Sequence, residues 1–114
     1  MVDVSSRPAR LAAELHRRGA QFVVVGSTAR WLTAGGGSPR DLDVAVCPVD
    51  LPALARALDS LGVRTTVDRL ARGGQSHVDT SWGPLDVFVD DALRCRVGTY
   101  ARGGRTWQLA VLPA

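Results

Sequence analysis

Two apolar runs separated by a short glycine-containing segment constrain this chain more than any other feature. Residues 22–25 read Phe-Val-Val-Val, and residues 44–47 return to apolar side chains directly after Asp41 and Asp43. A continuous β-branched run is typical of a strand that is covered on both faces. The order predicts a buried strand, a turn at Gly26, a helix over residues 28–34 and a second buried strand.

Gly26 and Ser27 lie where the first strand is expected to end. Glycine lets a ligand or another segment approach the backbone closely, and serine is a favourable N-cap. The unpaired N–H groups in the first turn of the following helix can hold a phosphate. A plain strand-to-helix turn with a capping serine and no ligand is the alternative interpretation.

Asp41 and Asp43 are expected to open the second strand. Side chains alternate along a strand, so the two carboxylates share one face, roughly 7 Å apart. Such a pair repels and is costly to desolvate unless a cation lies between its members. Mg²⁺ takes oxygen ligands and holds nucleotide phosphates at the same time. A solvated strand end that binds nothing is the alternative here.

The order Gly26-Ser27, a spacer, and then Asp41-Leu42-Asp43-Val44 resembles the signature of the polymerase-β-like nucleotidyltransferase superfamily. The nearest types are the small nucleotidyltransferases of toxin–antitoxin and abortive-infection systems, with the antibiotic nucleotidyltransferases as relatives. The resemblance covers residues 20–89. It implies the nucleotidyltransferase fold and a third carboxylate on a later strand, for which Asp86 in Leu85-Asp86-Val87 is the match, with Asp79 as a competitor.

The resemblance also implies a reaction. Two Mg²⁺ ions would be held by Asp41, Asp43 and Asp86, and a nucleoside triphosphate would be the substrate. A nucleoside monophosphate would pass to a hydroxyl of a small molecule, protein or RNA end, with release of pyrophosphate.

The triphosphate would lie on Gly26 and Ser27, with Arg30 or Arg40 offsetting its charge. Related enzymes continue into C-terminal helices that help to bind the acceptor, and this sequence lacks them. The acceptor is therefore undefined, and a dimer mate or partner subunit is a candidate to complete the site.

Two other classes of function stay open. A binding or regulatory protein, such as an antitoxin-like or scaffold subunit, could keep the fold and the acidic residues without catalysis. A nucleic-acid-binding domain would need the arginines to converge on one face. The net charge of +3 and the scattered positions of the 14 arginines do not by themselves indicate nucleic-acid binding.

Composition agrees with one domain over residues 1–114, because 46% apolar residues can build a core. The expected fold is α/β, with a mixed or antiparallel sheet and helices mainly on one face. Cys47 and Cys95 fit neither a zinc spacing nor a disulfide framework, and Cys47 is expected to be buried in its strand. No signal-peptide pattern and no membrane-spanning run is present, so we expect a cytoplasmic protein without membrane association.

Local patterns predict the remaining elements. Helices are expected from Pro8 to Arg18, with His16 solvated, and over residues 51–61. A short strand is expected over 63–67, a polar loop over 69–76, paired strands over 77–81 and 85–89, and a hairpin of strands over 96–100 and 106–112. The glycines at 35–37 and 73–74 are expected to lie in loops, the second a connection or a flap over the nucleotide. His77 and Asp79 are expected to be structural, and Trp31 and Trp107 to pack in the core.

Overall fold

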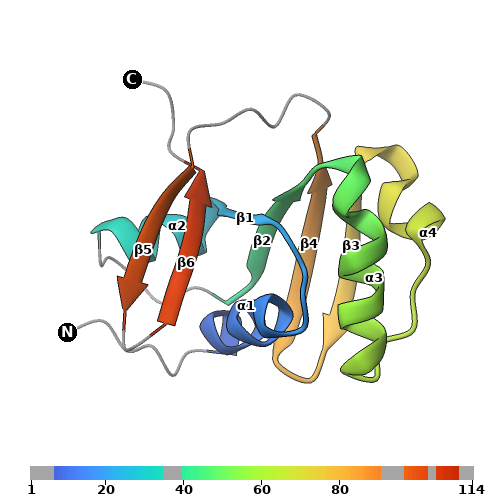
Figure 1. Ribbon diagram of the computed structural model, residues 1–114, viewed down its shortest axis with the longest axis horizontal. Coiled ribbons are helices and arrows are strands. Elements are labelled where there is room, and N and C mark those ends of the chain that lie inside the picture. Colours follow the sequence, from blue (N-terminus) through green and yellow to red (C-terminus); the bar gives the residue numbers. More distant parts are fainter. Residues whose placement is uncertain (1–6, 35–39, 91–96, 103–104, 111–114) are drawn as a thin grey trace.

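A mixed sheet forms the centre of the molecule, whose computed structural model describes residues 7–34, 40–90, 97–102 and 105–110. Within these residues the sheet has six strands in the order β3-β4-β2-β1-β6-β5 (Figure 1). The strands are β1 (Val23–Val25), β2 (Leu42–Val46), β3 (Gln75–Thr80), β4 (Gly83–Val89), β5 (Val97–Arg102) and β6 (Arg105–Ala110). The α-helices are α1 (Arg7–Arg17), α2 (Gly26–Ala34), α3 (Leu51–Ser60) and α4 (Val67–Ala71).

Parallel and antiparallel pairings alternate across the sheet. β1 is antiparallel to β2, β2 is parallel to β4, and β4 is antiparallel to β3. On the other side, β1 is parallel to β6, and β6 is antiparallel to β5. The prediction of an α/β fold with a mixed sheet is confirmed, as are the paired strands β3 and β4 and the hairpin of β5 and β6.

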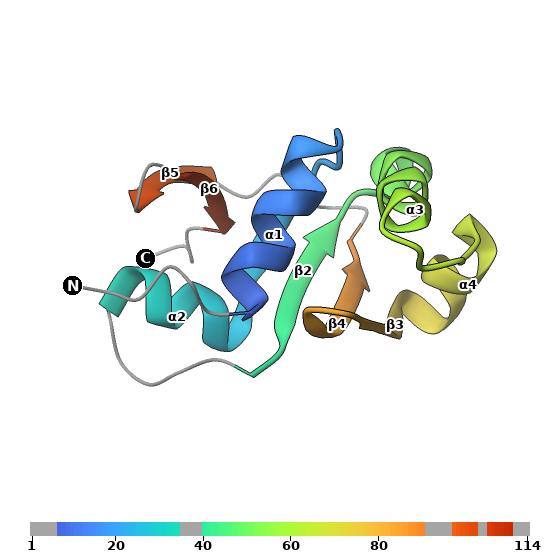
Figure 2. The same ribbon diagram turned by 90° about the horizontal axis from the view of Figure 1, so that it is seen from below.

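The helices divide between the two faces of the sheet. α1 and α3 lie on one face, and α2 lies on the other against β1 and β2 (Figures 1 and 2). In β1, Val23 and Val24 point to opposite faces and both are buried, as expected of a strand covered on both sides. The prediction of helices mainly on one face holds for α1 and α3, but α2 departs from it.

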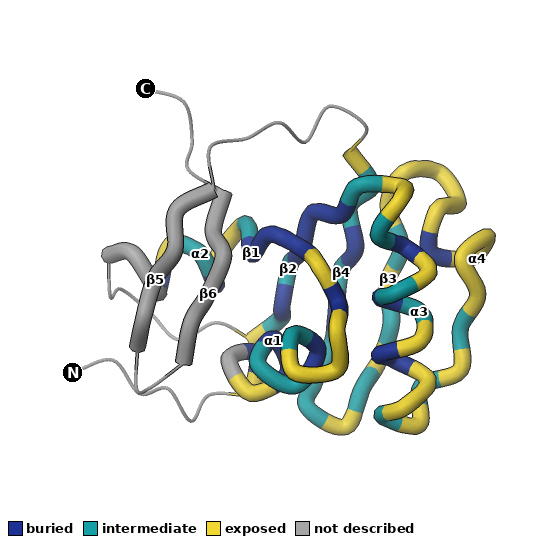
Figure 3. Tube along the Cα trace, in the orientation of Figure 1, coloured by how far each residue is buried: buried dark blue, intermediate teal, exposed yellow. Residues whose placement is uncertain are grey.

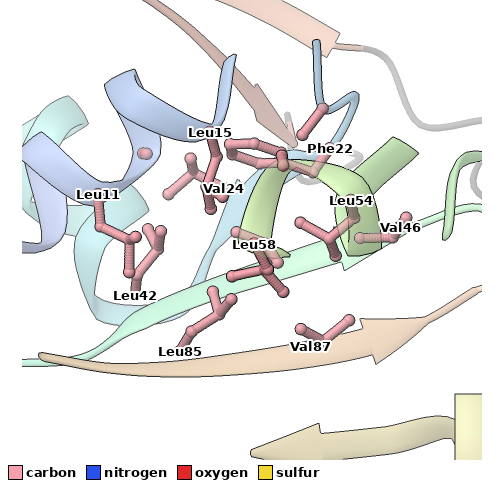
Figure 4. Packing of buried hydrophobic residues seen from close by; sticks show 14 of the residues in the cluster. Leu11, Leu15, Phe22, Val24, Leu42, Val46, Leu54, Leu58, Leu85 and Val87 are labelled. Carbon is pink, nitrogen blue, oxygen red and sulfur yellow. The ribbon is translucent and has the colours of Figure 1, made fainter. Parts of the chain in front are cut away.

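The core lies between the sheet and the pair α1 and α3. Alternate residues of β2 and β4 face these helices, including Leu42, Val46, Leu85 and Val87 (Figure 4). From α3, the side chains of Leu51, Leu54 and Leu58 pack into this core, and all three are fully or almost fully buried. Each buried leucine contributes about 1.5–3 kcal/mol. The opposite side of β2 and β4 carries the residues of the candidate site.

The segment after α3 differs from the prediction. Residues 63–66 form no strand, and the expected polar loop over 69–76 is instead the end of α4, a 3₁₀ turn at Arg72–Gly74 and the start of β3. Thr66 caps α4, because its side chain accepts a hydrogen bond from the Arg69 N–H at 3.2 Å. Thr66 therefore begins a helix rather than continuing a strand, and Leu70 anchors that helix in the core.

His16 is the second correction, because it is not a solvated helix residue. Its ring stacks on Phe22 with a centroid distance of 3.9 Å, and Nδ1 lies 3.2 Å from the carbonyl oxygen of Ala20. Burial lowers the pKa of His16, which favours the neutral ring. His16 thus helps to close the turn between α1 and β1.

Smaller differences concern element ends. α2 begins at Gly26 rather than residue 28, and Cys47 lies one residue past β2 and is half-buried rather than buried. Trp31 is buried, as predicted. The expectations for the glycine segment 35–37 and for the Cys95 and Trp107 side chains lie outside what the structure describes. Among the described residues, no helix has the length and apolarity needed to cross a bilayer.

Candidate active site

One row of directly paired residues crosses four strands. Val25 of β1 pairs with Asp43 of β2, which pairs in turn with Asp86 of β4. On the far side, Asp86 pairs with His77 of the edge strand β3. Paired residues on neighbouring strands project from the same face of a sheet. The row therefore brings together Asp43 and Asp86, hereafter the acid pair, on the face opposite α1 and α3.

The surroundings of Asp43 disfavour its charged form. Burial raises the pKa of Asp43, and the charge of Asp86, a side-chain hydrogen bond to Asp86 and the charge of Asp41 raise it further, from 3.8 to about 6. Two carboxylates that share a site cannot both ionise without repulsion. A divalent cation would remove that repulsion, so the acid pair is a candidate set of metal ligands.

Gly26 leaves room for the Asp43 side chain. A Cβ at position 26 would collide with the Asp43 carboxylate and would lie 3.2 Å from its Cγ. The φ of +68° also falls in the left-handed region that favours glycine. Because Gly26 is the first residue of α2, the unpaired N–H groups of the first helical turn begin next to the acid pair.

Thr28 fixes the start of β2. Its side chain is fully buried, and Oγ1 donates a hydrogen bond of 2.9 Å to the carbonyl oxygen of Asp41. Asp41 lies in a bend directly before β2 and is half-buried. The hydrogen bond ties the first turn of α2 to the residue that precedes Leu42. The Asp41 charge is thereby held close enough to affect the pKa of Asp43.

His77 contacts the acid pair, although the sequence predicts only a structural role for it. His77 Nδ1 lies 2.8 Å from Oδ1 of Asp86, and Nε2 lies 3.0 Å from Oδ1 of Asp79. An imidazolium donates at both nitrogens, so the two carboxylates favour the charged ring. The hydrogen bond to Asp86, followed by that to Asp79, raises the pKa of His77. Asp79 reaches the site through His77, whereas Asp86 is the direct neighbour of Asp43.

The burial pattern agrees with a site at the edge of the core. β1 and β2 are mainly buried, whereas β3 alternates between half-buried and exposed residues (Figure 3). Asp43 lies in a buried strand and His77 is exposed. The acid pair therefore lies where a buried region meets solvent, which leaves a route for a ligand.

The donor set fits a metal–nucleotide complex better than a metal ion alone. In the part of the chain that the structure describes, no three His, Cys, Asp or Glu side chains converge closely enough to hold a metal ion. Mg²⁺ in nucleotide sites, however, is held by one or two carboxylates together with substrate phosphates. Asp43 and Asp86 supply two adjacent carboxylates of this kind, with Asp41 nearby.

The other predicted nucleotide-binding residues lie on α2 and in the segment directly before β2. Ser27 and Arg30 are exposed on α2, Ser27 in its first turn and Arg30 three residues later. Arg40 is exposed directly before Asp41, and its side chain forms no ion pair with any described residue. No salt link from Arg40 therefore fills the space beside the carboxylates.

Searches against protein-family models, curated proteins and solved structures found no match.

Proposed function

We propose that this protein is a Mg²⁺-dependent nucleotidyltransferase with the polymerase-β-like fold. The observation that carries the proposal is the direct pairing of Asp43 with Asp86, with the backbone of Gly26 against the Asp43 carboxylate. Two adjacent carboxylates beside a helix N-terminus suit a bound cation and a polyphosphate together. The order of strands, with β2 between an antiparallel β1 and a parallel β4, supports the finer fold assignment.

The reaction would transfer a nucleoside monophosphate to an acceptor hydroxyl. The hydroxyl oxygen forms a bond to the α-phosphorus, the bond from that phosphorus to the oxygen of the β-phosphate breaks, and pyrophosphate leaves. When bound, two Mg²⁺ ions would supply Lewis-acid activation of the nucleophile and stabilise the charge on the leaving group.

The chain's own residues would have three tasks in this reaction. Asp41, Asp43 and Asp86 hold the metal–nucleotide complex, and Asp86 takes the proton of the acceptor hydroxyl. The first-turn N–H groups of α2, at Gly26 and Ser27, bind the phosphates. Arg40, or Arg30 on α2, offsets the charge that remains on the triphosphate.

The test is transfer of label from α-³²P nucleoside triphosphates, with Mg²⁺, to protein, RNA or small-molecule fractions, together with pyrophosphate release. Asp43→Asn should lower the rate at least a hundredfold. Asp59→Asn, an exposed position on α3 with the same change of charge, serves as the matched control. Transfer that survives in Asp43→Asn would rule the proposal out.

A non-catalytic binding or regulatory role is the second candidate, and one observation favours it. The acid pair has no third carboxylate within metal-binding distance among the described residues, and one of its members is engaged by His77. Calorimetry with Mg²⁺ and each nucleoside triphosphate separates the two candidates. Binding without turnover, or no binding at millimolar nucleotide, would favour the partner role.

A further inference from the structure

A polar pocket lies between the edge strand β3 and the segment that carries α4. Its volume is about 510 Å³, within the range of small-molecule sites. Basic and polar side chains dominate the lining, among them Arg64, Arg69, Arg72, Gln75, His77 and Asp79. His77 also contacts Asp86 at 2.8 Å, so the pocket adjoins the acid pair through one shared side chain.

The three arginines of the pocket have no anionic partner in the described part of the chain. None of their side chains forms an ion pair or a hydrogen bond there. The one carboxylate of the lining, Asp79, is engaged with His77 at 3.0 Å. A guanidinium stays charged at any accessible pH. The pocket therefore holds an excess of positive charge that nothing within it neutralises.

Contacts between α4, β3 and the core hold the walls of the pocket in place. Leu70 is fully buried and anchors α4 in the core. Arg69 precedes Leu70 and Arg72 follows it by two residues, so the backbone of both arginines is held in place. Both arginines line the pocket. Ser76 Oγ donates a hydrogen bond of 3.1 Å to the Leu70 carbonyl oxygen and ties β3 to α4. The wall with the arginines and the floor on β3 are thus joined without a ligand.

We infer that this pocket binds a phosphate group of the acceptor substrate, an inference that rests on the proposed nucleotidyl transfer. Arginine forks match phosphate oxygens in pairs, which gives both charge and orientation. The volume has room for a sugar phosphate or a molecule of nucleotide size. With its phosphate on Arg64, Arg69 and Arg72, such an acceptor presents a hydroxyl past His77 toward the acid pair. The acceptor class is therefore a phosphorylated polyol or sugar.

The experiment uses the full chain and ribose 5-phosphate as the probe, with ribose and inorganic phosphate as separate arms. Calorimetry should detect binding of ribose 5-phosphate and not of ribose. Arg69→Gln/Arg72→Gln should weaken that binding at least tenfold. The matched control, Arg10→Gln/Arg56→Gln, removes the same charge from exposed positions on α1 and α3 and should change it less than twofold. Equal binding by the two double variants would overturn the inference.

A second measurement separates this inference from the proposed function. With Mg²⁺ and a non-hydrolysable nucleoside triphosphate at saturation, ribose 5-phosphate should still bind, because acceptor and nucleotide occupy different sites. Competition between them would assign the arginines to the nucleotide and overturn the acceptor role. If the nucleotide does not bind while ribose 5-phosphate does, the transferase proposal fails and the phosphate pocket stands without an acceptor role.

Discussion

Asp43 and Asp86 are direct partners in the parallel pairing of β2 with β4, although a helix, a second short helix and a whole strand separate them in the chain. Each carboxylate is therefore held by a sheet rather than by a loop, and neither can move far from the other. Burial and mutual repulsion make the charged pair unfavourable without a cation. The pair is thus poised to bind a positively charged ligand.

Asp43→Asn is expected to stabilise the protein in the absence of divalent ions. The raised pKa means that the folded state binds a proton more tightly than the unfolded state, so the free energy of unfolding falls as the pH rises from about 4 to about 6. Since Asp43 is partly exposed, solvent screening reduces the effect, and we expect a gain of about 1 kcal/mol near neutral pH. Urea unfolding of the two proteins at several pH values measures it. A gain that is equally large below pH 4 would show that the charge is not its cause.

Gly26→Ala is expected to be more destabilising than Gly62→Ala. Both glycines have positive φ, but a Cβ at position 62 meets nothing within 4 Å, whereas one at position 26 collides with Asp43. The two variants share the strain of the left-handed backbone, so their difference isolates the collision, which we place at roughly 1–2 kcal/mol. Thermal unfolding provides the comparison.

A double variant tests the cause of that difference. Gly26→Ala combined with Asp43→Ala should recover most of the excess loss, because the colliding side chain is gone. If the two losses simply add, then the clash does not explain the destabilisation.

Sequence patterns were sufficient for the part of the fold that depends on local periodicity. The β-branched run before Gly26 and the alternation after Asp41 predict β1 and β2, and both strands are mainly buried as expected. Asp43 and Asp86 were predicted as site residues, and the structure pairs them. The strand predicted over residues 63–67 is wrong. β-branched residues favour a strand, but the Thr66 side chain instead caps α4 by accepting a hydrogen bond from the Arg69 N–H.

The contact of His77 with Asp86 depends on strand register, which propensity alone does not fix. The tight turn at Ser81 and Trp82 pairs Thr80 with Gly83, and three further steps along the hairpin pair His77 with Asp86. Counting the register from a known turn would have found the contact. The helical pattern of α1 does not predict the burial of His16, because its ring stacks on Phe22 only once the chain turns from α1 into β1.

The imidazole of His77 is expected to titrate above pH 6.5 and to respond to the acid pair. Its hydrogen bond to Asp86 is the main cause of the raised pKa and that to Asp79 is second. Asp86→Asn should therefore bring the pKa closer to 6.5 than Asp79→Asn does. Mg²⁺ with a non-hydrolysable nucleotide should also lower it, because a cation on Asp86 competes with the imidazolium. NMR titration of the His77 ring protons measures the pKa in both variants and in the presence of Mg²⁺–nucleotide. A His77 pKa that is unchanged in Asp86→Asn would contradict the contact between the two side chains.

Thr28→Val is expected to destabilise the protein and to weaken binding of Mg²⁺–nucleotide. The substitution keeps the shape of the fully buried side chain but removes the hydroxyl, which leaves the Asp41 carbonyl oxygen without the 2.9 Å hydrogen bond. Because Asp41 is half-buried, we expect the loss of this hydrogen bond to cost about 0.5–1.5 kcal/mol. Because the same bond fixes Asp41 before β2, its loss should also raise the Kd of the metal–nucleotide complex several-fold, measured by calorimetry.

Thr28→Ser retains the hydroxyl and should restore most of that affinity even where it lowers stability. If the serine variant binds as weakly as the valine variant, packing by the methyl group, rather than the hydrogen bond to Asp41, positions the site.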